Sequence, residues 1–333
     1  MKEAMFWRKQ DSKVECLLCP HRCKISEGKR GICGVRENQK GKLNTLIYGL
    51  ATSVTPDPIE KKPLFHFFPG TYVLSFGTVG CNFKCLHCQN YGISQAKIEA
   101  MRFQNVKVED VVKIAKRYKC QGVAWTYNEP SIWYEFTYDA SVAAKVEGLY
   151  TCYDTNGFIE REPLEKISPY LDAMNIDVKS FNDDFYKKIC KAKLQPVLDT
   201  CSLAKELGIF IELTYLIIPG QNDSEAEIKE YCKWVVDTLG ENTPIHFSRF
   251  HPDYKMTDSI ATPMSTLTGA FEIAKEKGIR YVYLGNVPHG DYENTYCSEC
   301  GDLLIERIGF STRSHFVKDG KCPKCNLVIP LRQ

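Results

Sequence analysis

Apolar and polar positions follow two alternating patterns along most of the chain. Short apolar runs rich in β-branched and aromatic residues are typical of buried strands, whereas longer charged stretches with apolar residues on one face are typical of helices. The short runs predict strands at 72–77, 122–127, 149–155, 173–178, 210–217, 245–250 and 281–285. The longer stretches predict helices at 107–119, 200–208, 224–240 and 266–278, several of which end on Gly.

The repeated alternation of strand and helix indicates an α/β fold. Strands joined through helices run parallel and are connected by right-handed crossovers. Six or seven units are too few for a complete eight-fold barrel. The two folds that fit this number are a partial (β/α)6 TIM-type barrel and an open doubly wound sheet. Polar motifs follow one strand after another, as they do at the C-terminal ends of barrel strands. We therefore expect a partial barrel.

Composition narrows the classes of function. The 333 residues include 43 Lys and Arg and 41 Asp and Glu, a net charge of +2, so no basic field favours nucleic acid. No apolar run reaches the roughly 20 residues that span a bilayer, and the first residues lack the apolar core of a signal peptide. We expect a cytoplasmic protein that binds neither nucleic acid nor a membrane.

Sixteen cysteines in such a chain favour metal ligation over disulfides. Five of them are isolated and are expected to be ordinary buried residues. The other eleven form three groups: Cys16, Cys19, Cys23 and Cys33; Cys81, Cys85 and Cys88; and Cys297, Cys300, Cys322 and Cys325. The outer groups predict small metal-binding appendages on the barrel, with segments at 1–71, 72–290 and 291–333.

The two outer groups each supply four thiolates. The C-terminal group consists of two C-x2-C knuckles, a strong signature of a closed site for zinc or for rubredoxin-type iron. The N-terminal group has the spacing C-x2-C-x3-C-x9-C. Either zinc or an auxiliary [4Fe–4S] cluster fits that spacing, which does not separate the two.

The central group has only three cysteines. Cys81, Cys85 and Cys88 lie in "CNFKCLHC", directly after the first predicted barrel strand. Three thiolates can hold three irons of a [4Fe–4S] cluster and leave the fourth iron free to bind a small molecule. The alternative is a zinc site that is completed by His87 or by a distant residue.

This loop resembles that of the radical S-adenosylmethionine (SAM) superfamily. "TYNEP" (126–130), "YDTNG" (153–157) and "IDVKS" (176–180) follow in order. They resemble segments of the enzymes that activate glycyl-radical enzymes, such as pyruvate formate-lyase activating enzyme. Over nearly its entire length the chain looks closest to the AmmeMemoRadiSam-type radical SAM proteins, through segments such as "DPIEKKPLFHFFPG", "SRFHPDYKMTD" and "YVYLGNVPH".

The resemblance implies roles for individual residues. Glu129 would receive the ammonium group of SAM and Lys179 would contact its carboxylate. A monovalent cation beside that carboxylate would have four ligands: Asp154, Thr155, Asp177 and the carbonyl of Val178. Without a cluster, the same residues would form an Asx-type turn and cross-strand charge pairs. His251 or His246 is expected near the ribose or the substrate, with a core histidine as the alternative.

The expected function is radical SAM chemistry. The cluster would cleave SAM reductively and yield a 5′-deoxyadenosyl radical that abstracts hydrogen, with a ferredoxin- or flavodoxin-like electron donor as a partner. By motif the enzyme resembles a glycyl-radical activase, whose substrate is a protein. The alternative is radical modification of a small molecule or of a companion protein, since the subgroup is named for two companion proteins. A non-catalytic zinc scaffold is the minor alternative.

Overall fold

The computed structural model describes residues 2–288 and 290–333, so His289, the last residue of "YVYLGNVPH", lies outside the described residues. Its centre is an eight-stranded sheet with the order β16-β15-β14-β13-β12-β11-β9-β8. The strands are β8 (Ser53–Pro58), β9 (Tyr72–Gly77), β11 (Gly122–Trp125), β12 (Tyr150–Thr155), β13 (Ala173–Asp177), β14 (Phe210–Ile217), β15 (Ile245–Arg249) and β16 (Val282–Gly285). All neighbours from β9 to β16 pair in parallel, whereas β8 pairs antiparallel with β9.

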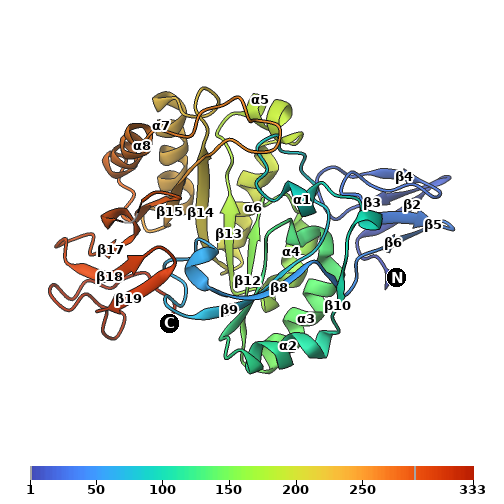
Figure 1. Cartoon of the computed structure of the whole chain (residues 1–333), viewed down its shortest axis with the longest axis horizontal. Coiled ribbons are helices and arrows are strands. Elements are labelled where there is room, and N and C mark those ends of the chain that lie inside the picture. The colour runs from blue at the N-terminus through green and yellow to red at the C-terminus, as the bar shows by residue number, and fades with distance from the viewer. Residues whose placement is uncertain (1, 289) are drawn as a thin grey trace.

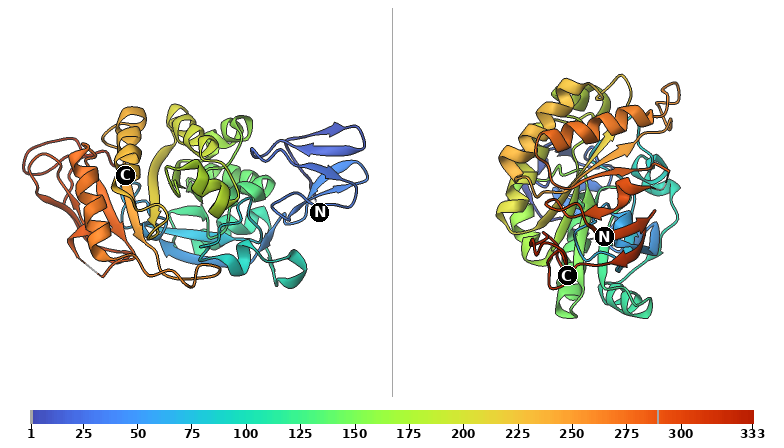
Figure 2. Two further views of the ribbon diagram at one scale, coloured as in Figure 1. Left: turned by 90° about the horizontal axis from the view of Figure 1, so that it is seen from above. Right: turned by 90° about the vertical axis from the view of Figure 1, so that its left-hand side faces the viewer.

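The order of the parallel strands shows which α/β architecture has formed. Each strand lies beside the next one in the chain, without the reversal of order that a doubly wound sheet has at its switch point. Six helices connect the strands: α2 (Val108–Arg117), α3 (Tyr134–Val146), α4 (Arg161–Ile167), α6 (Gln195–Glu206), α7 (Glu225–Trp234) and α8 (Met264–Glu276). They cover the outer face of the sheet (Figures 1 and 2). The predicted partial (β/α)6 barrel is therefore confirmed.

The seven predicted strands form within two residues of their expected ends. Helix α6 begins at Gln195, five residues before its expected start, because Pro196 occupies its first turn. Helices α3 and α4 were not predicted from the sequence. In α3 the reason is that the helix is buried on several sides, so its sequence lacks an amphipathic period. Strand β8 contains Pro56 and Pro58, which the edge of a sheet tolerates.

The N-terminal segment forms two small antiparallel sheets at one end of the molecule (Figure 1). Their strands are β1 (Lys2–Glu3), β2 (Trp7–Gln10), β3 (Lys13–Cys16), β4 (Lys24–Ser26), β5 (Arg36–Gln39) and β6 (Lys42–Thr45). A fully buried ion pair between Arg36 and Glu135 joins them to α3. Glu135 also accepts a hydrogen bond of 2.7 Å from the amide of Met5. A further short pair consists of β7 (Leu50–Ala51) and β10 (Gln104–Asn105).

The C-terminal segment forms a three-stranded sheet at the opposite end (Figures 1 and 2), with β17 (Thr295–Tyr296), β18 (Leu303–Ile308) and β19 (Ser311–His315). It packs on the segment that links β8 to β9. Buried Arg307 donates to the carbonyl of Phe65 at 2.7 Å and lies 3.6 Å from the carboxylate of Glu60. The amide of Arg332 donates to the carbonyl of His66 at 2.9 Å.

A buried polar network lies between the sheet and this C-terminal segment. Glu212 on β14 accepts hydrogen bonds from the His66 amide and from Nε2 of His246, both at 2.7 Å. Nε2 of His66 lies 2.6 Å from the hydroxyl of Tyr283, which lies 2.8 Å from that of Thr295. His246 is therefore a core histidine whose Nε2 is hydrogen-bonded to Glu212. A core histidine was the alternative that the sequence left open.

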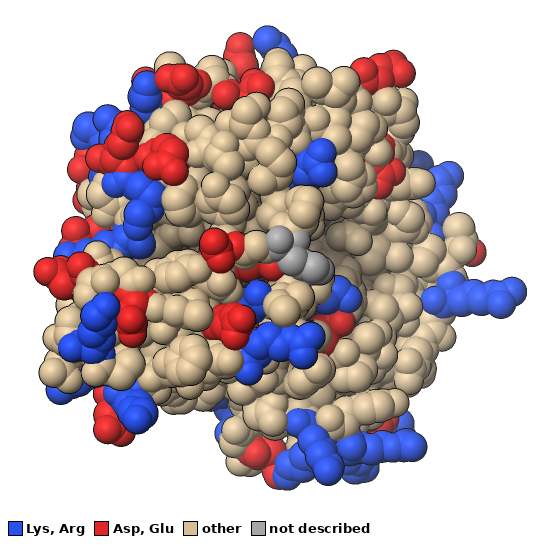
Figure 3. Space-filling model, turned by 60° about the vertical axis from the view of Figure 1, so that its left-hand side comes forward, with Lys and Arg blue, Asp and Glu red and all other residues tan. Residues whose placement is uncertain are grey.

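The surface carries both signs of charge. On the face drawn in Figure 3, Lys and Arg side chains are interspersed with Asp and Glu. This mixture agrees with the small net charge of +2. Among the described residues, none of the helices has both the length and the apolar character that crossing a bilayer requires.

Replacing Glu212 by Ala should destabilise the fold, because it leaves two buried donors without an acceptor. We expect a loss of roughly 3 kcal/mol in the free energy of unfolding, measured by denaturant titration. Glu206→Ala on the exposed face of α6 is the control and should change stability by less than about 0.5 kcal/mol. Equal effects of the two substitutions would show that the network does not stabilise the fold.

Candidate active site

A cavity of about 230 Å³ opens at the C-terminal ends of the parallel strands. Six successive strands, from β9 to β15, contribute to its wall directly or through the loop that follows. The residues named from the sequence that line it are Cys81, Cys85, Cys88, Glu129, Asp154, Thr155, Asp177 and Lys179. The fold therefore gathers residues that are as much as 98 positions apart in the chain into one site, as a barrel does at this end.

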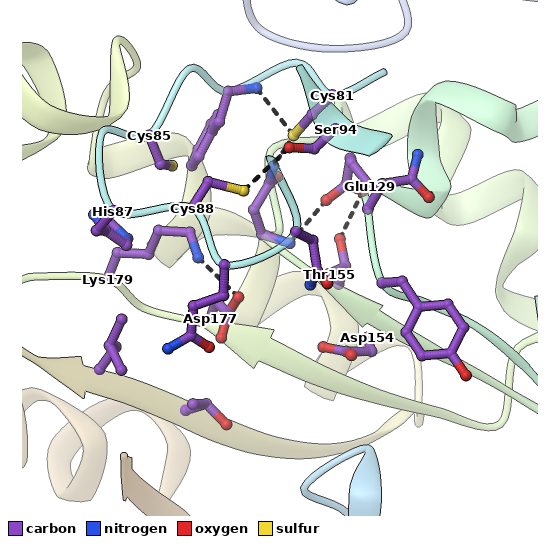
Figure 4. Close-up of a pocket in the computed structure, with 18 of the residues that line it drawn as sticks. Cys81, Cys85, His87, Cys88, Ser94, Glu129, Asp154, Thr155, Asp177 and Lys179 are labelled. Atoms are coloured by element: carbon purple, nitrogen blue, oxygen red, sulfur yellow. Dashed lines mark hydrogen bonds and ion pairs between the residues drawn. The ribbon is translucent and has the colours of Figure 1, made fainter. Parts of the chain in front are cut away.

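The loop with the three cysteines is held from outside the cavity. The amide of Lys84 donates to the carbonyl of Cys190 at 2.9 Å, and that of Leu86 donates to the carbonyl of Ile189 at 3.1 Å. Both acceptors belong to a π-helical turn, η5 (Tyr186–Cys190). Because the backbone is fixed in this way, the Cys81 and Cys88 sulfurs point to the cavity in Figure 4.

The three thiols are too far apart for one small ion. Around a tetrahedral zinc with Zn–S bonds of about 2.3 Å, sulfur atoms lie roughly 3.8 Å from one another. Within the described part of the chain, only the C-terminal cysteines bring three or more ligand atoms within 4.8 Å of one another. Cys81, Cys85, Cys88 and His87 do not, although His87 lines the same cavity. Their separation fits a cluster with one iron for each thiolate.

The thiols also need a positive partner. Burial, and then the charge of Glu129, raises the pKa of the Cys81 thiol far above its usual range. A thiolate at this position is therefore stable only beside a compensating charge, such as that of cluster iron. Two polar groups lie beside these sulfur atoms: the amide of Phe83 donates to the sulfur of Cys81 at 3.3 Å, and the hydroxyl of Ser94 lies 3.1 Å from that of Cys88.

Glu129 is 1% exposed and is held by three hydrogen bonds. The amide of Ser131 and the hydroxyl of Thr155 donate to Oε1 at 2.9 and 2.8 Å, and the amide of Asn156 donates to Oε2 at 2.9 Å. Burial raises the pKa of Glu129, whereas these hydrogen bonds lower it in part. A buried carboxylate that faces a cavity in this way is suited to pair with an ammonium group.

Two further carboxylates and one lysine form the opposite wall (Figure 4). Lys179 Nζ lies 2.8 Å from Oδ2 of Asp177, and the hydroxyl of Thr126 donates to Oδ2 of Asp154 at 2.7 Å. Burial, and then the charge of Asp177, raises the pKa of Asp154. Burial lowers the pKa of Lys179, but the negative groups around it outweigh burial and the net direction is upward. A carboxylate whose proton affinity is raised by a second carboxylate nearby is suited to share a cation with it.

Lys62 was not predicted from the sequence as a site residue, although it lies in the "DPIEKKPLFHFFPG" segment. It is 1% exposed, pairs with Asp57 at 2.9 Å and stabilises the charge of Asp154. It also lies 4.3 Å from the centre of the Tyr127 ring. The φ of Tyr127 is 74°, in the left-handed region that favours Gly. The hydrogen bond from its hydroxyl to Asp57 helps to hold this strained backbone.

Two more residues were missed. Nδ2 of Asn156 lies 3.7 Å from the Cys81 sulfur and donates to Oδ1 of Asn82 at 2.8 Å. Its signal was the "DTNG" motif, in which only Asp and Thr had been assigned roles. Cys190 was expected to be an ordinary buried cysteine, yet its thiol is a near neighbour of Cys85 and raises the pKa of the Cys85 thiol. No local pattern marked it, because the contact joins two distant loops.

The remaining predicted residues lie elsewhere. His251 is exposed beyond the end of β15 and does not line the cavity, and its expected contact with the ribose or the substrate stays a prediction. The N-terminal cysteines line a separate small cavity. The C-terminal cysteines gather tightly, with sulfur distances of 3.5 Å between Cys297 and Cys325 and 3.7 Å between Cys300 and Cys322.

Comparison with known proteins places this geometry in a family. Residues 76–232 match the model of the Radical SAM superfamily. An uncharacterized protein of Methanocaldococcus jannaschii is 52% identical over 334 residues, which cover 99% of each chain. Pyruvate formate-lyase 1-activating enzyme of Escherichia coli is 27% identical over 191 residues, which cover 55% of this chain and 75% of the enzyme.

A solved structure agrees with the fold. A radical SAM methyltransferase from Sphaerobacter thermophilus superimposes with a TM-score of 0.52 at 16% identity, over 71% of each chain. At this identity the similarity concerns the fold alone. The family match and the gathered cysteine loop agree with this fold. We conclude that the chain belongs to the radical SAM superfamily.

Proposed function

We propose that Cys81, Cys85 and Cys88 hold a [4Fe–4S] cluster and that SAM binds to it in the same cavity. The observation that carries this proposal is the combination in one cavity of three separated thiols with a buried carboxylate and a carboxylate–lysine group. When bound, the reduced cluster and SAM supply a 5′-deoxyadenosyl radical, which abstracts hydrogen from a substrate.

The residues of the chain have distinct tasks in this proposal. Glu129 accepts the ammonium group of SAM, and its three hydrogen bonds keep it charged and aligned. Lys179 binds the carboxylate of SAM. Asp154, Thr155, Asp177 and the Val178 carbonyl hold a monovalent cation, which reduces the repulsion between the two Asp side chains. Lys62 adds a fixed positive charge beside Asp154.

The more distant relatives of the chain indicate two candidate substrates for this proposed reaction. The relatives that activate pyruvate formate-lyase favour a glycyl-radical activase, whose substrate is a protein. A second candidate is radical modification of a small molecule or of a companion protein. It is favoured by the two cysteine-rich end segments, since the similarity to the E. coli enzyme covers only 55% of this chain. Either reaction needs a low-potential donor such as ferredoxin or flavodoxin.

At the C-terminus we propose a structural zinc site. The sulfur distances of 3.5 and 3.7 Å match the roughly 3.8 Å that tetrahedral zinc requires. The local apolar cluster is small and contains Cys297 and Cys322 themselves, so metal binding contributes much of the stability of this segment.

The cluster proposal predicts release of 5′-deoxyadenosine. After anaerobic reconstitution with iron and sulfide, the protein should cleave SAM in the presence of dithionite, as followed by chromatography. Cys81→Ala should abolish the cleavage, because it removes one of three iron ligands. The matched control is Cys232→Ala in α7, which removes a buried thiol outside the cavity and should retain most of the activity. Absence of 5′-deoxyadenosine from the wild-type protein would contradict the proposal.

The cation proposal predicts opposite effects of Asp154→Asn on binding and on stability. Loss of one carboxylate should weaken the cation site roughly 10- to 100-fold, measured as the potassium dependence of SAM cleavage. In cation-free protein at pH 7 the same change should raise the melting temperature. The reason is that a carboxyl group whose pKa is raised by folding destabilises the fold when it is ionised.

Asp199→Asn, on the exposed side of α6, is the control and should change neither quantity. Unaltered potassium dependence in Asp154→Asn would argue against a cation at this position.

The zinc proposal predicts that Cys322→Ser releases one metal ion and loosens the C-terminal sheet. Metal analysis should find zinc in the wild-type protein and less in the variant, and limited proteolysis should then cut between residues 295 and 333. The matched control, Cys201→Ser in α6, should keep its zinc. A red iron chromophore in place of zinc would identify a rubredoxin-type site instead.

A further inference from the structure

The N-terminal cysteines share a cavity of their own. Cys16 ends β3, Cys19 and Cys23 lie in the loop before β4, and Cys33 lies in the loop before β5. All four line one small cavity whose other walls are mostly aliphatic and include Leu18, Ile25, Ile32 and Ile132. Four thiols that converge from separate loops on an apolar pocket are the donor set of a metal site.

The separation of the sulfur atoms distinguishes between the two metals that fit the sequence. Among the described residues, the C-terminal thiols meet the distance that one ion requires, and the N-terminal thiols do not. The N-terminal sulfurs do not form such a group, although they line the same cavity. In this respect they resemble Cys81, Cys85 and Cys88. Each thiolate of a [4Fe–4S] cluster binds a different iron, so its sulfurs lie farther apart than around zinc.

A buried arginine completes the N-terminal site. Arg36 is 1% exposed and lines the cavity, and its Nη1 donates to the Cys16 sulfur at 3.4 Å. Its Nη2 pairs with Glu135, while its Nε has no hydrogen-bond partner among the described residues. A buried cation with a free donor is suited to an anionic cluster, and hydrogen bonds to cluster sulfurs are one of the factors that set a reduction potential.

The two cysteine sites are neighbours. A Cβ atom on Gly80 would lie 2.7 Å from the carbonyl oxygen of Cys33, so the backbone before Cys81 touches the N-terminal loop. Nε2 of His21 lies 2.8 Å from the carbonyl oxygen of Asn82. Asn82 itself lines the N-terminal cavity, and Cys81 beside it lines the central one. One peptide bond therefore separates the walls of the two sites.

The N-terminal cysteines are partly accessible from the surface. Cys19, Cys23 and Cys33 are partly exposed and Cys16 is buried, whereas in the central group only Cys88 is partly exposed. Ile32, next to Cys33, is 45% exposed. Residues 1–50 contain eleven Lys and Arg and five Asp and Glu, a net charge of +6 against +2 for the whole chain. Such a surface attracts an acidic partner over a distance.

From these observations we propose that the N-terminal cysteines hold a second [4Fe–4S] cluster, which relays electrons from an acidic low-potential carrier to the central cluster. One electron leaves the reduced carrier, which is oxidised, and reduces the N-terminal cluster. The same electron then passes across the Cys33–Gly80 contact and reduces the central cluster, while the N-terminal cluster returns to its oxidised state. This inference rests on the proposed function of the central site.

The identity of the N-terminal metal can be tested without any catalytic activity. A variant in which Cys81, Cys85 and Cys88 are all replaced by Ala should still bind about four iron and four sulfide per chain after anaerobic reconstitution. Its reduced form should give an electron paramagnetic resonance signal that SAM does not alter. Additional replacement of Cys23 and Cys33 by Ser should remove this signal. Zinc in place of iron in the triple variant would overturn the proposal.

The relay is tested by changing the reductant. Cys23→Ser/Cys33→Ser in the otherwise intact protein should lose SAM cleavage with reduced flavodoxin but keep it with dithionite, which is small enough to reach the central site. Full activity of this variant with flavodoxin would overturn the relay. Absence of cleavage by wild-type protein with either reductant would refute the proposed function instead, and the triple variant would still report on the N-terminal cluster.

A surface variant keeps the test valid if the cysteine variant does not fold. Lys24→Glu/Lys29→Glu alters two exposed residues near the N-terminal site and should lower the flavodoxin-driven rate about tenfold at low salt, with no change in the dithionite-driven rate. The matched control is Lys318→Glu/Lys321→Glu, at the opposite end of the molecule, which should leave both rates unchanged. Equal loss in the two charge variants would argue against entry of electrons at the N-terminal end.

Discussion

The arrangement of the molecule depends on how three buried charges, at the end of β8 and in the segment that follows it, find partners. Asp57, Glu60 and Lys62 are all almost inaccessible to solvent, and an unpaired charge in such a position would cost several kcal/mol. Asp57 and Lys62 pair with each other beside the active cavity, while Glu60 pairs with Arg307 of the C-terminal segment. The same short segment therefore shapes the cavity wall and docks the C-terminal sheet.

The spacing of sulfur atoms separates three cysteine groups that look alike in composition. At the C-terminus two hairpin-like knuckles place four sulfurs around one point, which suits a single ion. In the central and N-terminal groups the thiols come from loops that are fixed by other contacts, such as the bonds from Lys84 and Leu86 to η5. Their sulfurs remain apart, which suits a cluster with several irons.

One residue of the active cavity has an unusual backbone conformation, yet the contacts of the motif around it are kept. Tyr127 occupies a left-handed position that would suit Gly, and its ring is held between Lys62 and Asp57. Glu129, two residues later, still reaches Thr155 and Asn156. The strain at Tyr127 is therefore balanced by contacts to a segment that is far away in sequence, and the backbone of the motif is preserved.

Much of this protein could be predicted from sequence because its signals are local. Alternating apolar runs predicted seven strands, and the order of the motifs after them predicted where Glu129, Asp154 and Asp177 would meet. Helix α3, strand β8, Lys62 and Cys190 escaped prediction, since burial on several sides or a contact between distant loops leaves no periodic trace.

Where His251 lies relative to the cavity depends on the direction of the chain beyond β15, and that direction is a tertiary property. The choice between one ion and a cluster in the N-terminal group was likewise open in the sequence. Cysteine spacing along a chain limits which thiols can meet, but only the packing of their loops decides how far apart the sulfur atoms lie.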